Sequence, residues 1–206
     1  MSAPLIVGLG GTSKAGSSSG RVLRAALTAC EAFGCRTRIF DGPALDLPLF
    51  APERPVPSGA IALVEALRRA DGIIIASPGY HGTVSGLVKN ALDYVEMLAD
   101  DERPYFEGRA VGLIAVAAGW QAAGSTLVTL RTVAHALRGW PTPIGIAANS
   151  ALPLFDEDGS LVEVAMRTQL SLMAEQLVEF VGRFASHMPS PGETADVARF
   201  DELTGS

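Results

Sequence analysis

The sequence predicts an α/β protein in which helices cover both faces of a parallel sheet. Short apolar runs alternate five times with segments of helical periodicity along the 206 residues, which is the pattern of successive strand–helix units. The runs at 72–76 and 110–117 are apolar without alternation, as expected of strands that are buried on both faces. The length fits one domain, and 48 % hydrophobic against 18 % charged residues excludes a disordered chain.

The expected strands and helices alternate from the N-terminus onward. The strands are expected at Pro4–Leu9, Arg36–Phe40, Gly72–Ala76, Ala110–Ala117 and Ile144–Ala148. The helices are expected at Val22–Phe33, Gly59–Ala70, Ser85 to about Leu98, about Gln121–Leu137, and from Ser160 onward. Trp140-Pro-Thr-Pro is expected to end the fourth helix, and Ser160 with Glu163 forms a Ser-x-x-Glu capping box for the last one. Residues 1–188 are then the domain, and residues 189–206 are a C-terminal tail.

Charge and cysteine usage exclude several classes of protein. A net charge of −6 and a pI near 5.1 give no electrostatic reason to expect nucleic acid. No run approaches the roughly 18 apolar residues of a membrane span, and the N-terminus lacks the pattern of a signal peptide. Cys30 and Cys35 are isolated thiols that suit a reducing compartment. A cytoplasmic location is therefore expected.

The segment Ser77–Asp93, directly after the third strand, carries the strongest local signal. Pro78 is expected to stop the strand ladder, because proline lacks an N–H donor. Two glycines then flank two ring side chains, in the order Gly79, Tyr80, His81 and Gly82. The glycines are expected to allow positive φ and close approach of a ligand, and the rings offer stacking and hydrogen bonding. Ligands bind beyond the carboxyl ends of strands in open α/β sheets.

The loop at residues 10–20 has the composition of an anion site. It contains glycines, several hydroxyls and Lys14, and it precedes a helix. Backbone N–H groups, hydroxyls and a helix N-terminus together favour phosphate. In the strand order 2-1-3-4-5, strands 1, 3 and 4 are neighbours, so the loops after them converge on one crevice.

Three familiar motifs are nearly matched in this loop, and each fails. Gly8-Leu-Gly-Gly-Thr-Ser lacks the third glycine of a dinucleotide fingerprint, and no acidic residue is expected about twenty positions on at the end of the second strand. Ser17 stands where the lysine of a P-loop belongs. Gly16-Ser-Ser-Ser-Gly lies too far beyond its strand to be a nucleophile elbow. Three scattered histidines make no metal constellation. The remaining use of the loop is to hold the phosphate of a cofactor that carries the chemistry itself.

Three segments resemble one known family, the NADPH-dependent FMN reductases. Gly11-Thr-Ser-Lys-Ala-Gly-Ser-Ser-Ser resembles the family's phosphate loop, commonly Gly-Ser-x-Arg-x-x-Ser-x-Thr. Pro78-Gly-Tyr-His-Gly-Thr-Val-Ser-Gly-Leu-Val-Lys-Asn-Ala-Leu-Asp93 is similar to Pro-x-Tyr-x-x-x-x-(Ser/Pro)-Gly-x-Leu-Lys-Asn-x-Leu-Asp, which is the longer and more specific match. Leu47-Pro-Leu-Phe50 resembles the family's Leu-Pro-Leu-Tyr/Phe segment. The resemblance covers roughly residues 4–150.

The resemblance implies a fold, a cofactor and a set of binding residues. It implies a flavodoxin-like three-layer sandwich with a five-stranded parallel sheet of order 2-1-3-4-5, bound FMN, and hydride transfer to it from NADPH or NADH. The phosphate would be held by Thr12, Lys14, Ser17, Ser18 and Ser19. The isoalloxazine ring would lie along Pro78, Gly79, Tyr80 and His81, with its other edge closed by Ala118, Gly119 and Trp120. No general acid or base is required for the hydride transfer.

Several roles remain open at this point. Lys14 replaces the family's usual arginine and is a phosphate contact or a solvated charge. Trp120 stacks on flavin or nicotinamide, or closes the pocket. Tyr80 and His81 line the flavin or pack at a subunit interface. Lys89 and Asp93 are spaced for a surface ion pair.

Three function classes fit the sequence. The first is a reductase that supplies reduced FMN to a partner such as a monooxygenase. The second is an FMN-bound reductase of quinones, azo dyes or metal oxyanions, and the least favoured third is a flavodoxin-type electron carrier. A homodimer or homotetramer is expected, because the helices after the third and fourth strands are apolar and rich in alanine.

Overall fold

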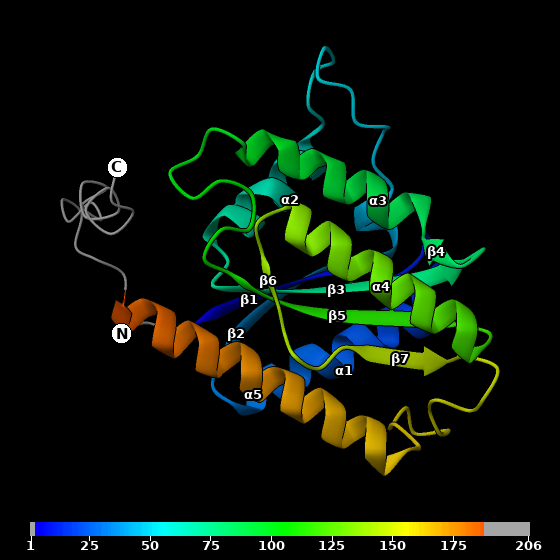
Figure 1. Ribbon diagram of the computed structural model, residues 1–206. Coiled ribbons are helices and arrows are strands. Elements are labelled where there is room, and N and C mark those ends of the chain that lie inside the picture. Colours follow the sequence, from blue (N-terminus) through cyan, green and yellow to red (C-terminus); the bar gives the residue numbers. More distant parts are fainter. Residues whose placement is uncertain (1–2, 188–206) are drawn as a thin grey trace, which may run out of the picture.

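A parallel β-sheet forms the middle layer of the computed structural model, which describes residues 3–187 (Figure 1). The strand order is β2-β1-β3-β5-β6, with β7 also paired to β5 and β4 paired to β3. The strands are β1 (Leu5–Gly10), β2 (Arg36–Asp41), β3 (Gly72–Tyr80), β4 (Thr83–Val84), β5 (Ala110–Ala117), β6 (Trp140–Pro141) and β7 (Ile146–Asn149). All pairs are parallel except that between β3 and β4.

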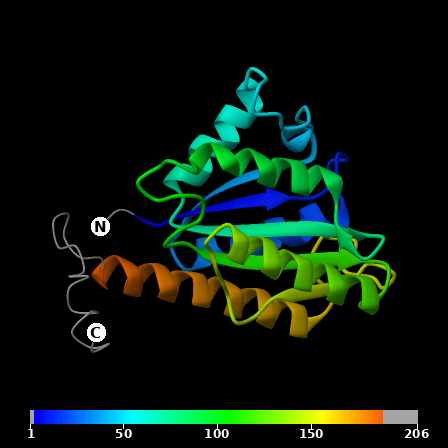
Figure 2. The same ribbon diagram turned by 45° about the horizontal axis from the view of Figure 1, so that its top comes forward.

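Helices cover both faces of the sheet, with α1 and α5 on one side and α2, α3 and α4 on the other (Figures 1 and 2). The helices are α1 (Ser18–Ala32), η1 (Gly42–Leu45), α2 (Ser58–Arg69), α3 (Gly86–Asp93), η2 (Tyr94–Leu98), α4 (Trp120–Ala136) and α5 (Val164–His187). Each face has its own core of buried aliphatic side chains, which agrees with the unbroken apolar runs of β3 and β5. Within residues 3–187, no helix is long and apolar enough to cross a bilayer.

The predicted α/β class is confirmed, but the fifth position of the sheet differs from the prediction. Two short strands occupy it, since β6 pairs with the first half of β5 and β7 with the second half. The Trp140-Pro141 segment, which was expected only to end a helix, therefore forms β6. After Thr142, whose N–H still donates to the carbonyl of Val111, the N–H of Ile144 donates a 3.1 Å hydrogen bond to the Gln176 side chain instead of to β5. The Ile144 carbonyl accepts a 2.7 Å hydrogen bond from the Thr142 hydroxyl. The strand is broken between its two halves for this reason.

The third strand is longer than expected, and the prediction that Pro78 stops it is wrong. β3 runs through Pro78, which lies opposite Val116 of β5, and continues to Tyr80. The neighbouring strand β1 ends at Gly10, opposite Ala76. Beyond Ala76 the ladder on that side of β3 has ended, so the missing N–H of Pro78 disrupts no pairing there.

The start of the last helix also differs from the prediction. Ser160 does not cap it, because α5 begins only at Val164. The chain from Phe155 to Leu161 is held in a small antiparallel bridge, and the Ser160 N–H donates to the carboxylate of Asp156. That turn delays the helix by four positions relative to the predicted start. The proposed tail, residues 189–206, lies outside the described residues.

Candidate functional site

Four loops meet around a cavity of about 380 Å³ at the carboxyl ends of the strands. This is the end of the sheet toward which β7 points in Figure 1. The loops follow β1, β3, β5 and β7, so neighbouring parallel strands bring together segments that are far apart in the sequence. The cavity is lined by Thr12, Ser17, Ser18, Ser19, Pro78, Gly79, Tyr80, Val116, Ala117, Ala118 and Ser150.

One end of the cavity is built by the N-terminus of α1. The helix starts four residues earlier than predicted, so Ser17 is its N-cap and accepts a 3.2 Å hydrogen bond from the N–H of Gly20. Ser18 and Ser19 then occupy the first turn, which contains no acidic residue. The Ser19 side chain is 2 % exposed, and its hydroxyl has no hydrogen-bond partner among the residues that the structure describes. A buried hydroxyl without a partner beside a helix N-terminus is an unfilled donor for an anion.

Glycine at position 10 lets this loop approach β3 closely. A Cβ at Gly10 would lie 2.0 Å from the carbonyl oxygen of Ala76, and the backbone φ is +152°. The following residue, Gly11, donates a 3.1 Å hydrogen bond to the same carbonyl. No other residue type fits this contact, which fixes the loop against the neighbouring strand.

The wall opposite α1 is a tight hairpin formed by the end of β3 and by β4. Tyr80 pairs with Thr83, and the two residues between them, His81 and Gly82, have φ values of +53° and +81°. Positive φ at both central positions matches the two-residue turn that suits the twist of a hairpin. Tyr80 is 54 % exposed and lines the cavity, whereas His81 lies at the exposed tip and does not line it.

Gly79 lines the cavity as expected, but packing rather than a positive φ requires a glycine there. Its φ is not positive. A Cβ at this position would lie 2.7 Å from Thr126 Oγ1 and 2.9 Å from the Cβ of Ala117. The absence of a side chain therefore lets the hairpin lie directly against α4.

The loop after β5 supplies only part of what was expected of it. Ala118 lines the cavity, but Gly119 and Trp120 do not. Gly119 has a φ of +149° and precedes the first residue of α4, and no atom lies within 4 Å of a Cβ built there. Trp120 is 56 % exposed.

Lys14, in the loop at residues 10–20, and Lys89, in the segment Ser77–Asp93, also lie outside the cavity. Lys14 is exposed, and its N–H donates a 3.2 Å hydrogen bond to the hydroxyl of Thr12. Lys89 forms the expected ion pair with Asp93, one turn along α3. The cavity thus brings together eight of the twelve predicted residues and leaves out Lys14, His81, Gly119 and Trp120.

Three lining residues were missed by sequence reasoning: Val116, Ala117 and Ser150. The first two end the buried strand β5, whose apolar run gives no signal of a ligand contact. Ser150 follows β7, and its N–H donates a 2.8 Å hydrogen bond to the carbonyl of Ala117. The rule that ligands lie beyond strand ends would have indicated Ser150 had it been applied to the fifth strand.

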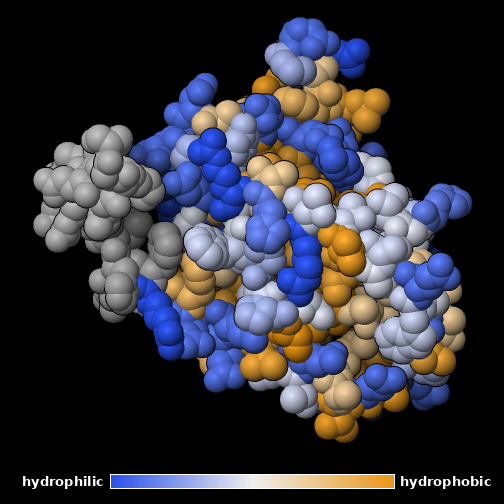
Figure 3. All heavy atoms as spheres, in the orientation of Figure 1, coloured by the Kyte–Doolittle hydropathy of each residue, from blue (hydrophilic) through white to orange (hydrophobic). Residues whose placement is uncertain are grey.

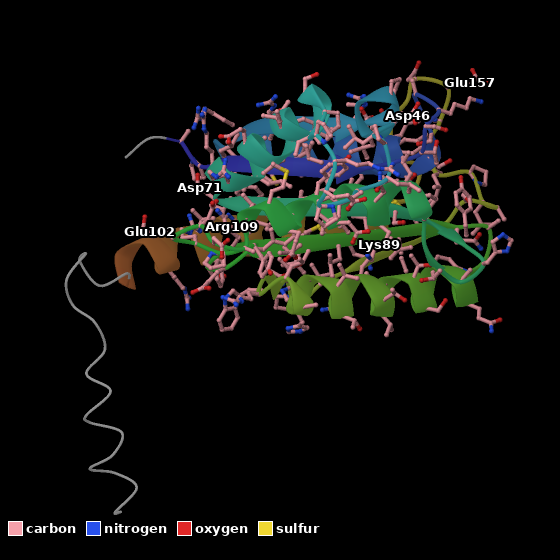
Figure 4. All side chains as sticks on the ribbon, turned by 90° about the horizontal axis from the view of Figure 1, so that it is seen from above. Asp46, Asp71, Lys89, Glu102, Arg109 and Glu157 are labelled. Atoms are coloured by element: carbon pink, nitrogen blue, oxygen red, sulfur yellow. The ribbon has the colours of Figure 1, made fainter. Side chains whose placement is uncertain are left out.

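An acidic residue does end the second strand, contrary to the sequence analysis. Asp41 is the last residue of β2, and its carboxylate receives hydrogen bonds of 2.8 and 3.0 Å from Nη2 of Arg24. Asp46 and Glu157 lie at this same end of the molecule, whereas Asp71, Glu102 and Arg109 lie at the other (Figure 4). Burial lowers the pKa of Arg109 to about 10, but its contacts are the carbonyls of Arg68, Ala70, Tyr105 and Glu107, far from the cavity.

The family model for NADPH-dependent FMN reductases matches residues 4–152, which include every residue that lines the cavity. The chain belongs to this family. The two segments that resemble the family's phosphate loop and its Pro-x-Tyr segment form two walls of the cavity, α1 with its preceding loop and the β3–β4 hairpin.

Curated proteins resemble the chain over a shorter stretch. The chain is 35 % identical over 121 residues to an FMN-dependent NADPH-azoreductase of Staphylococcus aureus, a match that covers 58 % of this chain and 61 % of that protein. The chain thus spans less than two thirds of the curated relatives that it matches.

Solved structures share the fold at low sequence identity. FerB of Paracoccus denitrificans, a flavoenzyme NAD(P)H:(acceptor) oxidoreductase, has a TM-score of 0.74 at 14 % identity, with 88 % of this chain and 99 % of that chain covered. An apo NADH:FMN oxidoreductase has a TM-score of 0.66 at 20 % identity, with 93 % and 94 % covered. The predicted flavodoxin-like fold is confirmed.

The residues present fit FMN. The buried, unpartnered hydroxyl of Ser19 and the acid-free first turn of α1 provide the donors that a phosphate monoester needs. At the other end of the cavity, Pro78, Tyr80 and Ala118 give the largely apolar surface that a flat ring requires.

Proposed function

We propose that the protein is an NAD(P)H-dependent FMN reductase. The observation that carries this proposal is one cavity with a phosphate-type end at Ser17–Ser19 and a ring-type wall at Pro78–Tyr80. Membership of the NADPH-dependent FMN reductase family supports the same reaction class.

The first turn of α1 binds the phosphate. Thr12, Ser17, Ser18 and Ser19 offer hydroxyls around the positive end of the helix dipole. Lys14 adds a positive charge on the same loop without lining the cavity. Ser150, on the far side of the cavity, offers one more hydroxyl that can bind the nucleotide.

The hairpin and the loop after β5 orient the ring. When bound, FMN supplies the hydride-accepting chemistry, and a nicotinamide supplies the hydride. The chain would hold the ring between the Tyr80 side chain and the backbone at Ala118, so that one face of the ring stays open to the nicotinamide. His81, Gly119 and Trp120 lie beyond this wall, and we assign them to the rim that a nicotinamide dinucleotide crosses.

Steady-state oxidation of NADPH and NADH, with and without added FMN, tests the proposal. FMN-dependent oxidation is expected, followed by electron delivery in a panel of azo dyes, quinones and metal oxyanions. Fluorescence titration of FMN gives an independent binding measurement. A protein that neither quenches FMN fluorescence nor oxidises either nicotinamide contradicts the proposal.

A second candidate is a reductase that retains FMN and acts on azo compounds or quinones. It is favoured by the relative named FMN-dependent NADPH-azoreductase. A yellow purified protein indicates this enzyme, whereas a colourless protein that uses FMN as a diffusing substrate indicates a supplier of reduced flavin to a monooxygenase. The flavodoxin-type carrier is disfavoured, because a carrier has no use for a nicotinamide.

We also propose that the protein is a homo-oligomer, a dimer or a tetramer. An apolar groove of about 260 Å³ lies between the projecting loop at residues 46–57 and η2. Leu49, Val56 and Met97 are 76, 37 and 36 % exposed there, and Figure 3 shows apolar atoms beneath the polar tip of this loop at the top. The Asn90 amide holds the base of this loop, because it donates to the carbonyls of Leu47 and Pro48 and accepts from the N–H of Phe50.

A second copy of the chain is the occupant that the charges favour. Arg54 and Glu96 both line the groove, so a two-fold contact in which Arg54 of each copy meets Glu96 of the other pairs unlike charges twice. Leu49→Glu is expected to shift the mass in light scattering toward the monomer, whereas Val164→Glu, at another strongly exposed apolar position, on α5, leaves it unchanged. A wild-type monomer at micromolar concentration contradicts the proposal. We place the protein in the cytoplasm, which the two free, buried cysteines support.

A further inference from the structure

The end of β2 packs directly against the proposed phosphate loop. A Cβ built at Gly20 lies 3.2 Å from Oδ2 of Asp41 and 3.2 Å from Oγ of Ser17. A Cβ at Gly11 likewise lies 3.6 Å from the Cβ of Asp41 and 3.5 Å from the Ser17 hydroxyl. The carboxylate of Asp41 and the hydroxyl that caps α1 are therefore neighbours on the same side of the loop.

This placement creates an electrostatic problem for an anion site. The Asp41 side chain is only 14 % exposed, so water screens its charge poorly. A phosphate group at Ser17–Ser19 carries a like charge and would be repelled. Asp46 and Glu157 lie at the same end of the molecule and add to the negative field (Figure 4).

Arg24 compensates the Asp41 charge. It lies on α1 one turn after Gly20, and its Nη2 donates to both carboxylate oxygens of Asp41 at 2.8 and 3.0 Å. Arg24 does not line the cavity, and its side chain is 55 % exposed. Arg24 therefore acts on a bound phosphate without touching it, by neutralising the Asp41 carboxylate and by the electrostatic field of its own positive charge.

We propose that Arg24 is a positioning residue of the FMN phosphate site, which neutralises Asp41 and so sets the preference for FMN over riboflavin. This inference rests on the proposed function, because it assumes that the flavin phosphate lies at Ser17–Ser19. Asp41 in turn holds the guanidinium beside the loop. Because the Arg24–Asp41 pair has no net charge, the Asp41 carboxylate can pack against the loop without repelling the phosphate.

Fluorescence titration of FMN and of riboflavin separates this role from a structural one, since only FMN carries the phosphate. Arg24→Gln is expected to raise the Kd of FMN about fivefold at low salt, as Coulomb's law predicts for a phosphate of charge about −2 roughly 8 Å from the guanidinium in water, and to leave the Kd of riboflavin unchanged. The difference is expected to shrink at high salt. Asp41→Asn is expected to lower the Kd of FMN, and the double variant to return it to within about twofold of wild type.

Arg138→Gln is the matched control, because it removes the same charge from an exposed pair with Glu107 outside the cavity. Its FMN and riboflavin affinities are expected to equal those of the wild type. Equal weakening of both ligands by Arg24→Gln, an unchanged Kd for FMN, or failure of Asp41→Asn to compensate overturns the inference. If Arg24→Gln does not fold, Asp41→Asn alone decides, since an unchanged or weaker FMN affinity refutes the charge argument. Failure of the wild-type protein to bind FMN refutes instead the proposed function.

Discussion

The hydroxyl of Ser125 in α4 donates a 2.8 Å hydrogen bond to the carbonyl of Gly82 at the tip of the β3–β4 hairpin. Together with the close packing of Gly79 on the same helix, this bond ties the hairpin wall to a rigid element. The position of the Tyr80 side chain in the cavity thus depends on α4 as well as on the sheet.

Loss of this bond is expected to loosen the hairpin. Ser125→Ala removes one neutral hydrogen bond, worth about 1 kcal/mol, so amide hydrogen exchange over residues 80–84 should accelerate and the Kd of FMN should rise. Thr129→Ala is the control, because its hydroxyl bonds only within the helix, to the carbonyl of Ser125. Equal exchange rates over residues 80–84 in Ser125→Ala and in wild type would contradict this role.

Packing between the hairpin and α4 predicts opposite effects of two alanine substitutions. Gly79→Ala forces a Cβ to 2.7 Å from Thr126 Oγ1, whereas no atom lies within 4 Å of a Cβ at Gly124 in α4. Gly79→Ala should lower the free energy of unfolding by about 1–3 kcal/mol, and Gly124→Ala should raise it by about 0.5–1 kcal/mol. Urea denaturation measures both. Partial rescue of Gly79→Ala by Thr126→Ala is expected, and two substitutions of the same sign would disprove the packing argument.

The unpartnered hydroxyl of Ser19 predicts that stability and binding respond in opposite directions. Ser19→Ala removes a buried polar group that has no partner, so thermal unfolding without ligand should occur at an unchanged or higher temperature. The Kd of FMN should rise about tenfold, because a hydrogen bond to a charged group is lost. Calorimetry and fluorescence titration measure the two effects. A destabilised variant with normal FMN affinity would contradict the assignment of Ser19 to the phosphate site.

Burial of Cys30 predicts a loss of stability at alkaline pH. Burial, followed by the influence of Cys35, raises the pKa of the Cys30 thiol from 9.0 to about 12. The folded state therefore keeps a proton that the unfolded state releases, so this contribution is complete below pH 9 and declines as the pH rises toward 12.

A comparison with Cys30→Ala isolates this thiol from other groups that titrate in the same range. Urea midpoints from pH 7.5 upward should fall more steeply above pH 9 in wild type than in the variant. Identical slopes would show that the thiol does not hold its proton on folding.

Much of the sheet could be predicted because burial on both faces leaves a clear pattern. The β5 range agrees with its prediction at both ends, and β1 and β2 differ by one residue. The prediction stopped β3 too early because Pro78 reads as a breaker, and only the register shows that β1 has already ended beside it. The same limit applies to β6. The prolines at 141 and 143 indicate a loop, although Trp140 and Pro141 pair with β5.

The candidate site was predictable where residue chemistry is local and unpredictable where it depends on contacts. Hydroxyls before a helix indicate an anion site, and Ser17, Ser18 and Ser19 do line the cavity. Gly79 also lines the cavity, but the reason for a glycine there was not predictable, because it is a close contact with Thr126, far along the chain. Asp41 was overlooked beside the loop, as only the pairing of β1 with β2 brings it next to Gly11 and Ser17.

The break between β6 and β7 has a consequence for the free edge of the sheet. A continuous outer strand offers a row of N–H and C=O groups on which another chain can add as a further strand. Here prolines at positions 141 and 143 remove donors, and Arg131 covers the carbonyls of Thr142 and Pro143. The β6 part of this edge therefore offers few groups to a further strand, which should limit β-sheet aggregation there when the protein is concentrated.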